Sequence, residues 1–487
     1  MNRPIRRVAV ALGVLMLALL VNLNYVQVVE SDSYRNNPGN RRVLIEEYSR
    51  QRGSIIADGI AVADSVKTKD RLKYLRRYPG GQMYANLTGF YSQVYGSQGL
   101  EAAEQGLLSG SDGRLFTTRF ADLITGRDPR GGNVTLTINR RVQAAAARAL
   151  NGRRGAVVAL DPSTGAILAA VSSPSYDPNT LSSHNTDEVT AAWTRLIHDK
   201  AAPMLDRALN QLYPPGSMFK VIDSAAALKS GRKPTTVLAA PARYLLPGTR
   251  TYLQNFNGEI CSQNGRLTLD QALTISCNTA FAKLAVDLGA PAIRAEAELF
   301  GLNDQAAEVP LTVAPSTVGP IADAAKLAES GIGQQDVRMT PLQAAMLSAA
   351  VANHGTLMKP YLVEQESAPN LSVLSKASPQ KQSQPVTAAQ AAVLTSMMEH
   401  VVTQGTGRGA RIPGVRVAGK TGTAETVRGA APHAWFTGFA PADKPRIAVA
   451  VVLENGGVAG NETTGGKAAA PVAAAVMKTY LDAVGAH

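Results

Sequence analysis

Residues 213–228, YPPGSMFKVIDSAAAL, contain the pattern on which the fold assignment depends. Ser217 and Lys220 are three residues apart, so in a helix they lie one turn apart on the same face. Two prolines and a glycine precede Ser217 and an apolar run follows it, which places the serine at a helix N-terminus. Backbone N–H groups there favour a developing anion. In a dry cleft the lysine loses its charge easily and accepts the serine proton, so the pair is typical of nucleophilic catalysis.

The Ser-x-x-Lys pattern is weak by itself, because the chain holds two further copies. Ser230 and Lys233 lie in KSGRKP, where glycine and proline oppose a helix. Ser378 and Lys381 lie in a polar stretch next to a proline. We interpret both of these copies as loop residues.

A Ser-x-Asn pattern also occurs three times. Ser276 and Asn278 lie in DQALTISCNTAFAKLAVDLG, residues 270–289, an apolar segment able to hold both side chains rigidly over a cleft. A hydroxyl there relays protons and an amide binds a peptide carbonyl. The other two copies, both in loop-like stretches, are Ser183/Asn185 and Ser262/Asn264.

Lys420-Thr421-Gly422, followed by Thr423, occurs once. A strand edge with this sequence offers backbone groups to an extended peptide, while the lysine and threonine meet a terminal carboxylate. Residues 414–421 also satisfy the phosphate-binding pattern GxxxxGK[ST], which requires a helix after the lysine. The following TGTAETVRGAAPHAWFTGFAP is rich in Gly, Thr and Pro, so we expect a strand and no ATPase.

The N-terminus carries a candidate membrane anchor. Arg3, Arg6 and Arg7 precede an uncharged run, residues 8–29, that is long enough to span a bilayer. A cleaved signal peptide is the competing interpretation, but no small-x-small site follows the run. Arginines before the span and none just after it place the N-terminus in the cytoplasm and the rest of the chain outside.

Length and composition predict two globular units, because single cores stop growing at roughly 250 to 300 residues. The chain has 487 residues, 45% hydrophobic and 18% charged, which excludes wholesale disorder. The net charge of +12 does not indicate a nucleic-acid partner, since aromatics are 5% and the basic residues are scattered. The positive charge is more simply explained by attraction to anionic lipid headgroups and wall polymers. We expect an anchor at 1–30, a small mixed domain at 31–150 and a large domain at 151–487.

The large domain shows strands at both ends and helices between them. GAVVALDPSTGAILAAVSSPSYDPN, residues 155–179, predicts a hairpin of strands 156–160 and 166–171. An α/β (α+β) sheet with helices on its faces is therefore expected. Further predictions are helices at 217–227, 270–288 and 341–353, a strand at 446–453 and a mobile polar excursion at 364–385.

Other notable residues receive structural interpretations. The only cysteines, Cys261 and Cys277, could pair outside the cytoplasm and add about 3 kcal/mol of stability, or remain as two buried thiols. Trp435 and Phe436 are expected in the core and Glu425 at a solvated turn. His354 and His433 have no metal-ligand spacing, and no metal or cofactor is expected.

In this order and these surroundings, Ser217-x-x-Lys220, Ser276-x-Asn278 and Lys420-Thr421-Gly422 resemble the motifs of penicillin-binding transpeptidases and serine β-lactamases. GIGQQDVRMTPLQAAMLSAAVANHG, GTGRGARIPGVRVAGKTGTAE and HAWFTGFAP are also similar to this family, from Gly155 to the C-terminus. RGSIIADG, GLE at 99–101 and TLTINRRVQ at 135–143 are similar to the N-terminal domain of the class B members. No stretch before Gly155 has room for a glycosyltransferase, which leaves the monofunctional members. The Ala-, Gly- and Arg-rich texture and the compact N-terminal part most resemble the actinobacterial members of this class.

The resemblance implies a central antiparallel sheet flanked by helices, with an all-helical lobe. It also implies peptidoglycan D,D-transpeptidation, in which Lys220 activates Ser217. Ser276 and Lys420 then pass the proton to the leaving amine. Substrate binding would fall to Asn278, Thr421, Gly422 and Thr423. Expected partners are D-Ala-D-Ala stem peptides, β-lactams, a glycan-polymerising membrane protein and division or elongation proteins.

Two alternatives keep the same fold. A β-lactam sensor or a non-catalytic division scaffold would bind without turnover, and a β-lactamase would rapidly hydrolyse its acyl-enzyme. One departure is that Cys277 lies between Ser276 and Asn278. A bridge to Cys261 would brace this loop and couple redox state to activity.

Overall fold

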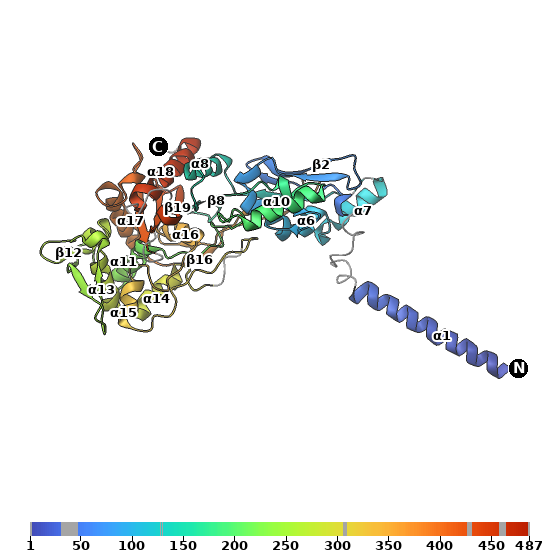
Figure 1. Cartoon of the computed structure of the whole chain (residues 1–487), viewed down its shortest axis with the longest axis horizontal. Coiled ribbons are helices and arrows are strands. Elements are labelled where there is room, and N and C mark those ends of the chain that lie inside the picture. Colours follow the sequence, from blue (N-terminus) through green and yellow to red (C-terminus); the bar gives the residue numbers. More distant parts are fainter. Residues whose placement is uncertain are drawn as a thin grey trace.

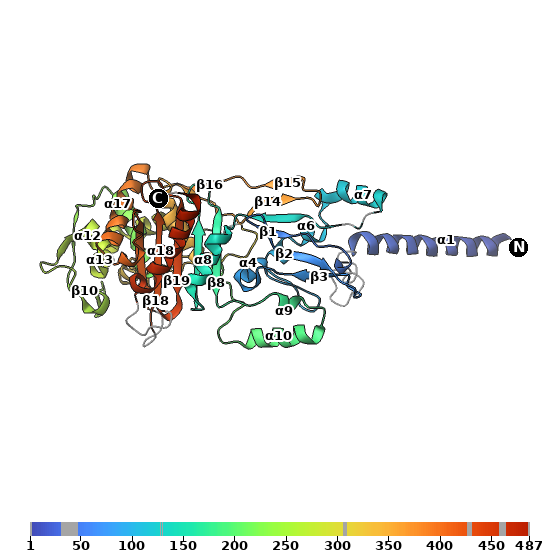
Figure 2. The same cartoon turned by 90° about the horizontal axis from the view of Figure 1, so that it is seen from above.

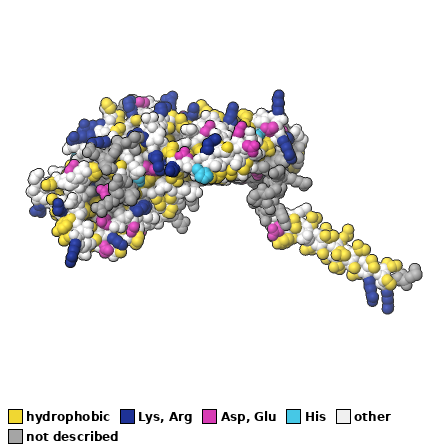
Figure 3. Space-filling model, viewed as in Figure 1, with side chains coloured by type: hydrophobic (Ala, Val, Ile, Leu, Met, Phe, Trp, Pro, Cys, Tyr) yellow, Lys and Arg dark blue, Asp and Glu magenta, His cyan; other side chains and the backbone are white. Residues whose placement is uncertain are grey.

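The computed structural model describes residues 2–30, 47–126, 128, 130–304, 309–425, 431–456 and 464–485. Figures 1 and 2 show an elongated folded body with one long helix, α1 (Asn2–Asn24), projecting from one end. The segment Arg3–Val28, which extends from α1 into the π-helical turn η1 (Tyr25–Val29), is long and apolar enough to cross a membrane and is not buried by the rest of the protein. Hydrophobic side chains cover α1, and basic side chains lie near its N-terminal end (Figure 3).

The larger part of the body is built on an antiparallel five-stranded sheet in the order β17-β18-β19-β7-β8. The hairpin β7–β8, with its turn at Asp161–Gly165, and the strand β19 confirm the sequence predictions. Because β17 is at the edge of the sheet, one side of it remains open for pairing. The strands are β7 (Gly155–Leu160), β8 (Ile167–Ser173), β17 (Ala418–Ala424), β18 (His433–Ala440) and β19 (Ile447–Leu453).

Helices cover both faces of this sheet. Alternate strand residues point to opposite faces, so Val157 and Val451 pack against one set of helices while Val158 and Val452 pack against the other. The first set comprises α8 (Arg140–Leu150) and α18 (Gly465–Val484). The second face carries α16 (Pro341–Ala352), the predicted helix, which is buried all along its length.

A helical lobe lies beyond α16, at the end of the body opposite α1 (Figure 1). Short hairpins β9–β12 and β10–β11 lie on its outside. The lobe contains α11 (Lys220–Lys229), α12 (Leu269–Thr274), α13 (Asn278–Leu288), α14 (Ala290–Leu299), α15 (Ala324–Ser330) and α17 (Ala388–Thr403). The hairpin strands are β9 (Val237–Ala239), β10 (Arg243–Leu245), β11 (Tyr252–Gln254) and β12 (Arg266–Thr268).

The part next to α1 contains a second sheet in the order β15-β14-β6-β1-β2-β3. Its strands are β1 (Ile55–Ala57), β2 (Ile60–Lys67), β3 (Tyr74–Arg77), β6 (Asn133–Leu136), β14 (Val363–Ser367) and β15 (Val373–Lys376). Around it lie α4 (Ala85–Thr88), α5 (Leu100–Ala103), α6 (Gln105–Ser109), α7 (Phe116–Thr125), α9 (Asn179–Ser182) and α10 (Thr186–His198).

The stretch 364–385 was predicted to be a mobile excursion, and that prediction is wrong. It supplies β14, β15 and β16 (Lys381–Ser383), and β14 pairs antiparallel with β6, more than two hundred residues earlier in the chain. The two parts of the body therefore share a sheet, and one hydrophobic core runs through both. Pairing between distant polar strands leaves no local hydrophobic pattern, which explains the error.

Candidate active site

Ser217 lies in a 3₁₀ turn, η4 (Gly216–Met218), directly before α11. The Gly216 N–H donates to the Gly333 carbonyl at 3.0 Å. Gly216 has φ 55°, and a Cβ there would lie 2.6 Å from the Thr423 carbonyl oxygen of β17. Only glycine therefore allows the turn to sit this close to the strand. The buried side chains of Met218 and Phe219 anchor the turn, while Ser217 remains partly exposed.

Lys220 begins α11 and its side chain is fully buried. Its Nζ donates to the Ser276 carbonyl and to the Asn278 Oδ1, each at 2.7 Å, and lies 3.3 Å from the Ser276 Oγ. Burial lowers the pKa of Lys220 well below its ordinary value, and the nearby charge of Lys420 lowers it further. A neutral amine, able to accept a proton, is therefore favoured at this position.

Ser276 lies in a break between α12 and α13, with φ 64°. The prediction of one continuous helix over 270–288 is therefore wrong, because a left-handed residue interrupts helical geometry. The break turns Ser276 toward the two lysines and lets Asn278 begin the next helix. The catalytic pattern is thus placed by a local irregularity that apolar spacing does not reveal.

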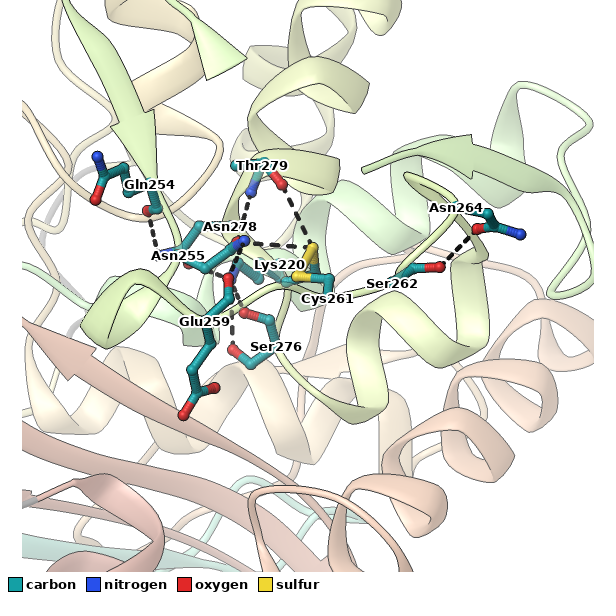
Figure 4. The surroundings of a disulfide bond; sticks show 11 residues. Lys220, Gln254, Asn255, Glu259, Cys261, Ser262, Asn264, Ser276, Asn278 and Thr279 are labelled. Carbon is teal, nitrogen blue, oxygen red and sulfur yellow. Dashed lines mark hydrogen bonds between the residues drawn. A yellow bond between two sulfur atoms is a disulfide. The ribbon is translucent and has the colours of Figure 1, made fainter. Parts of the chain in front are cut away.

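A disulfide joins Cys261 to Cys277, the residue between Ser276 and Asn278 (Figure 4). The Asn255 side chain adds a second support: its Oδ1 accepts from the Thr279 N–H at 3.1 Å, and its Nδ2 donates to the Glu259 carbonyl at 2.9 Å. The loop from 255 to 261 is therefore tied to the start of α13 by a covalent bond and by hydrogen bonds.

Lys420 occupies the middle of β17, so the phosphate-loop interpretation, which requires a helix after the lysine, does not hold. Its buried Nζ donates to the Ser276 Oγ at 2.9 Å and to the Thr421 carbonyl at 3.0 Å. Burial lowers the pKa of Lys420 from 10.5 to about 7. The Ser276 hydroxyl thus lies within hydrogen-bonding distance of both lysines.

The rest of the Lys-Thr-Gly strand faces the Ser217 turn. A Cβ on Gly422 would lie 2.6 Å from the Pro215 carbonyl oxygen, so a side chain there would push the turn away. The Thr421 Oγ1 lies 2.6 Å from the Thr406 Oγ1, and the Thr423 Oγ1 lies 3.5 Å from the Gly465 N–H. These contacts fix two hydroxyl groups beside the open edge of β17.

The structure assigns the remaining copies of the patterns to turns and caps. Asn185 caps α10 by accepting from the Asp187 N–H, and the Ser262 Oγ donates to the Asn264 Oδ1. Ser230 ends α11 by donating to the Ala227 carbonyl. Ser183, Lys233 and Ser378 also lie in this peripheral set, outside helices and strands. Lys381 instead begins the strand β16, so its interpretation as a loop residue is wrong.

Three residues near the site were not identified from the sequence. Thr406 and Gly333 lie in the GTGRG and GIGQ stretches, whose glycines were the available signal. Asp223 follows Lys220 by one turn and is fully buried, and neither of its carboxylate oxygens has a hydrogen-bond partner among the described residues. Burial raises the pKa of Asp223 well above its usual range, whereas Lys220 lowers it.

The two predicted core residues and the predicted turn residue lie as expected. Trp435 and Phe436 are fully buried in β18, which confirms their prediction as core residues. Glu425 is exposed at the end of β17. Within the described ranges, no group of three or more His, Cys, Asp or Glu residues is placed to hold a metal ion.

Comparison with known proteins gives consistent results along the whole chain. Residues 155–478 match the penicillin binding protein transpeptidase domain, and residues 52–134 match the penicillin binding protein A dimerisation domain. The peptidoglycan D,D-transpeptidase PbpA of Mycolicibacterium smegmatis is 49% identical, over 99% of both chains.

Solved structures agree with this assignment. The ceftriaxone acyl-enzyme complex of penicillin-binding protein A from M. tuberculosis is 48% identical, with a TM-score of 0.87, over 90% of this chain and 100% of that one. Its penicillin G acyl-enzyme complex is 48% identical, with a TM-score of 0.86, over 89% and 100%. The chain therefore belongs to the penicillin-binding protein transpeptidase family, in its class B, penicillin-binding protein A branch.

Proposed function

We propose that this chain is a membrane-anchored peptidoglycan D,D-transpeptidase that forms its acyl-enzyme on Ser217. The observation that carries the proposal is the cluster in which Lys220 and Lys420 both contact Ser276. Lys220 begins the helix that follows the Ser217 turn, and Lys420 lies on the strand that packs against this turn. The family relationship agrees with it, because the M. smegmatis relative is named a peptidoglycan D,D-transpeptidase and the M. tuberculosis structures are β-lactam acyl-enzymes.

In the first half-reaction, Lys220 accepts the Ser217 hydroxyl proton while the Ser217 oxygen attacks the carbonyl carbon between two terminal D-alanines. The buried, neutral amine of Lys220 suits this role as general base. The new bond is an ester, and the peptide C–N bond breaks to release the last D-alanine. Ser276 and Lys420 deliver the proton that the leaving amine needs, through the contact between the Ser276 Oγ and the Lys420 Nζ.

Charge on the attacked oxygen is met by the backbone N–H groups of Ser217 and Thr423. The approach of Gly216 to the Thr423 carbonyl supports this assignment, because it brings the two backbones side by side. Loss of one such donor typically slows catalysis by about 100-fold or more.

The open edge of β17 binds the extended stem peptide. Thr421 and Thr423 bind the terminal carboxylate, Gly422 lets the strand approach the serine turn, and Asn278 binds the substrate amide. In the second half-reaction, an amine from a neighbouring stem peptide takes the acyl group and frees Ser217. β-Lactams imitate the D-Ala-D-Ala end and remain as stable esters on the same serine.

Location and partners are further parts of the proposal. With its three arginines at the start, α1 would span the cell membrane once and leave residues 31–487 outside. Residues 31–150 would form a non-catalytic domain for dimerisation or as a pedestal, and residues 151–487 the catalytic domain. A glycan-polymerising membrane protein and other division or elongation proteins would work beside it in growth and division.

The alternative function is a β-lactam sensor or a division scaffold with the same fold. A non-catalytic scaffold does not need a leaving-group proton donor, yet Lys420 is buried at a free-energy cost and contacts Ser276. Acylation chemistry is therefore favoured over a purely structural role, and peptide turnover distinguishes the transpeptidase from a sensor.

The test is a turnover assay on the full-length protein in detergent. The chain is given a stem pentapeptide ending in D-Ala-D-Ala together with an amine acceptor, and both free D-alanine and the cross-linked product are measured. We expect both products, and neither from Ser217→Ala. Acylation by penicillin without peptide turnover would favour the sensor or scaffold, and rapid release of hydrolysed penicillin would indicate a β-lactamase.

A further inference from the structure

Helix α7 exposes a continuous apolar stripe. The side chains of Phe116, Phe120 and Ile124 are 63%, 55% and 70% exposed, although large apolar residues normally face a core. They recur every fourth residue, which places them along one side of the helix. The rings of Phe116 and Phe120 stack with centroids 6.3 Å apart, so the stripe forms a continuous surface.

The start of α7 is firmly attached to the folded body. Leu115, in the turn η3 (Gly113–Leu115), is buried in the core. The Asp112 carboxylate accepts from the Arg114 N–H at 2.8 Å, and the Arg114 side chain also pairs with Glu366 of β14. The exposed stripe therefore belongs to a helix whose first turn is fixed, rather than to a loose terminus.

The position of α7 points to what covers the stripe. Figures 1 and 2 both show α7 at the end of the folded body from which α1 projects, opposite the helical lobe. Sixteen residues, 31–46, connect Glu30, which follows the α1 segment, to Glu47. A chain of that length spans at most about 55 Å, so the folded body stays near the membrane that α1 would cross.

We propose that α7 docks on the outer surface of the membrane in which α1 is anchored, with Phe116, Phe120 and Ile124 inserted between the lipid headgroups and acyl chains. This inference rests on the proposed membrane anchor. Amphipathic helices of this kind lie in the interface with their apolar side buried about 5–10 Å. Together with α1, this contact fixes how the folded body stands on the membrane and holds the helical lobe, at the opposite end of the body (Figures 1 and 2), away from the bilayer.

Lipid fits the stripe better than a second copy of the chain does. A stable protein–protein interface needs roughly 20–30 residues on each side, whereas the stripe offers three large side chains. Charges around it nearly cancel, since Arg119 and Asp122 lie on α7 itself and Arg114 is paired with acidic partners. The contact is therefore mainly apolar and depends little on anionic lipid.

The test measures contact between α7 and acyl chains in the full-length protein. Phe120→Trp is reconstituted in vesicles of phosphatidylcholine with brominated or ordinary acyl chains, and the wild-type emission of Trp193 and Trp435 is subtracted. We expect roughly twofold quenching by brominated lipid, because the indole would lie within about 5–10 Å of the headgroup boundary. The matched control is Val237→Trp, on β9 at the far end of the body and 54% exposed.

Two further variants complete the experiment. Leu15→Trp, within α1, reports whether the anchor is inserted, and penicillin labelling of every variant reports that the site is folded. If brominated lipid quenches Leu15→Trp but not Phe120→Trp, the docking of α7 is wrong and the anchor stands. If it quenches neither variant, the proposed anchor is wrong as well. If the Phe120→Trp emission depends on the protein-to-lipid ratio and not on bromination, a second copy covers the stripe and the inference is wrong.

Discussion

The chemistry of the site depends on two buried lysines that contact one serine hydroxyl. Lys220 and Lys420 are both fully buried, and both Nζ atoms lie within hydrogen-bonding distance of the Ser276 Oγ. Burial disfavours the ammonium form of each, and the charge of Lys420 further disfavours the ammonium form of Lys220. In the proposed mechanism, Lys220 therefore starts as the neutral amine that accepts the Ser217 proton, and Lys420 releases a proton readily toward Ser276.

The buried Lys420 should make stability depend on pH. Its pKa is about 7 in the folded chain and 10.5 when exposed, so between these values the unfolded chain binds more protons and stability rises with pH. Lys420→Met removes this penalty. We expect Lys420→Met to exceed wild type in unfolding free energy at pH 7, with the difference shrinking by about 1.4 kcal/mol per pH unit toward pH 10.5.

Chemical unfolding of the full-length protein across that range measures the difference. Lys233→Met is the matched control, since Lys233 is exposed and its removal should leave the pH dependence unchanged. Parallel curves for wild type and Lys420→Met would show that Lys420 keeps an ordinary pKa, and the proposed proton route would lose its physical basis.

At the scale of single elements, the site depends on how short irregular segments are held. The break between α12 and α13 is braced by the Cys261–Cys277 disulfide, and the η4 turn is wedged between Gly333 and β17. Neither of these two segments is a regular helix or strand. Each places one side chain of the proposed mechanism.

The disulfide should support both stability and reactivity. Its reduction should lower the unfolding free energy by about 3 kcal/mol, as expected for a short closed loop, and should slow penicillin acylation because Cys277 lies between Ser276 and Asn278. Thermal melting and acylation rates, each with and without reductant, measure the two effects. The Cys261→Ser/Cys277→Ser variant controls for other actions of the reductant. Unchanged melting and acylation in reduced wild type would show that the bridge braces nothing.

Gly333 should be essential for the position of Ser217. With φ 71°, a Cβ at this residue would lie 2.0 Å from the Gly216 carbonyl oxygen, so Gly333→Ala must move η4. A displacement of about 1 Å typically costs on the order of 100-fold in rate, and we expect a loss of that size in penicillin acylation.

The matched control is Gly231→Ala. Gly231 also has a positive φ, 89°, but a Cβ there meets nothing within 4 Å. This variant therefore carries the backbone strain without the clash. Equal acylation rates for the two variants would mean that the Gly333 contact does not position the serine.

At the scale of the whole molecule, the sequence predicted the features that carry a periodic pattern. The hairpin β7–β8, the strand β19 and the buried helix α16 all appear as predicted, because apolar spacing marks them. The residues of the three motifs were also identified. The strands β14 and β15 were not, because they depend on pairing between segments far apart in the chain. The break at Ser276 and the burial of Asp223 were also missed, because apolar spacing does not mark either of them.

The fold unites three distant stretches into one site. The sheet supplies Lys420 on its edge strand, the helical lobe supplies Lys220 and Ser276, and the turn carrying Ser217 lies between them. The two other copies of Ser-x-x-Lys, at Ser230 and Ser378, lie outside this arrangement. We therefore propose Ser217 alone as the nucleophile.

Mass spectrometry of the full-length protein after treatment with penicillin G tests that claim most directly. We predict one adduct per chain, on the peptide that contains Ser217, and no adduct on Ser217→Ala. Ser230→Ala, the matched control from the peripheral copy, should be labelled like wild type. An adduct on Ser230 or Ser378, or an undiminished adduct on Ser217→Ala, would contradict the assignment of Ser217 as the nucleophile.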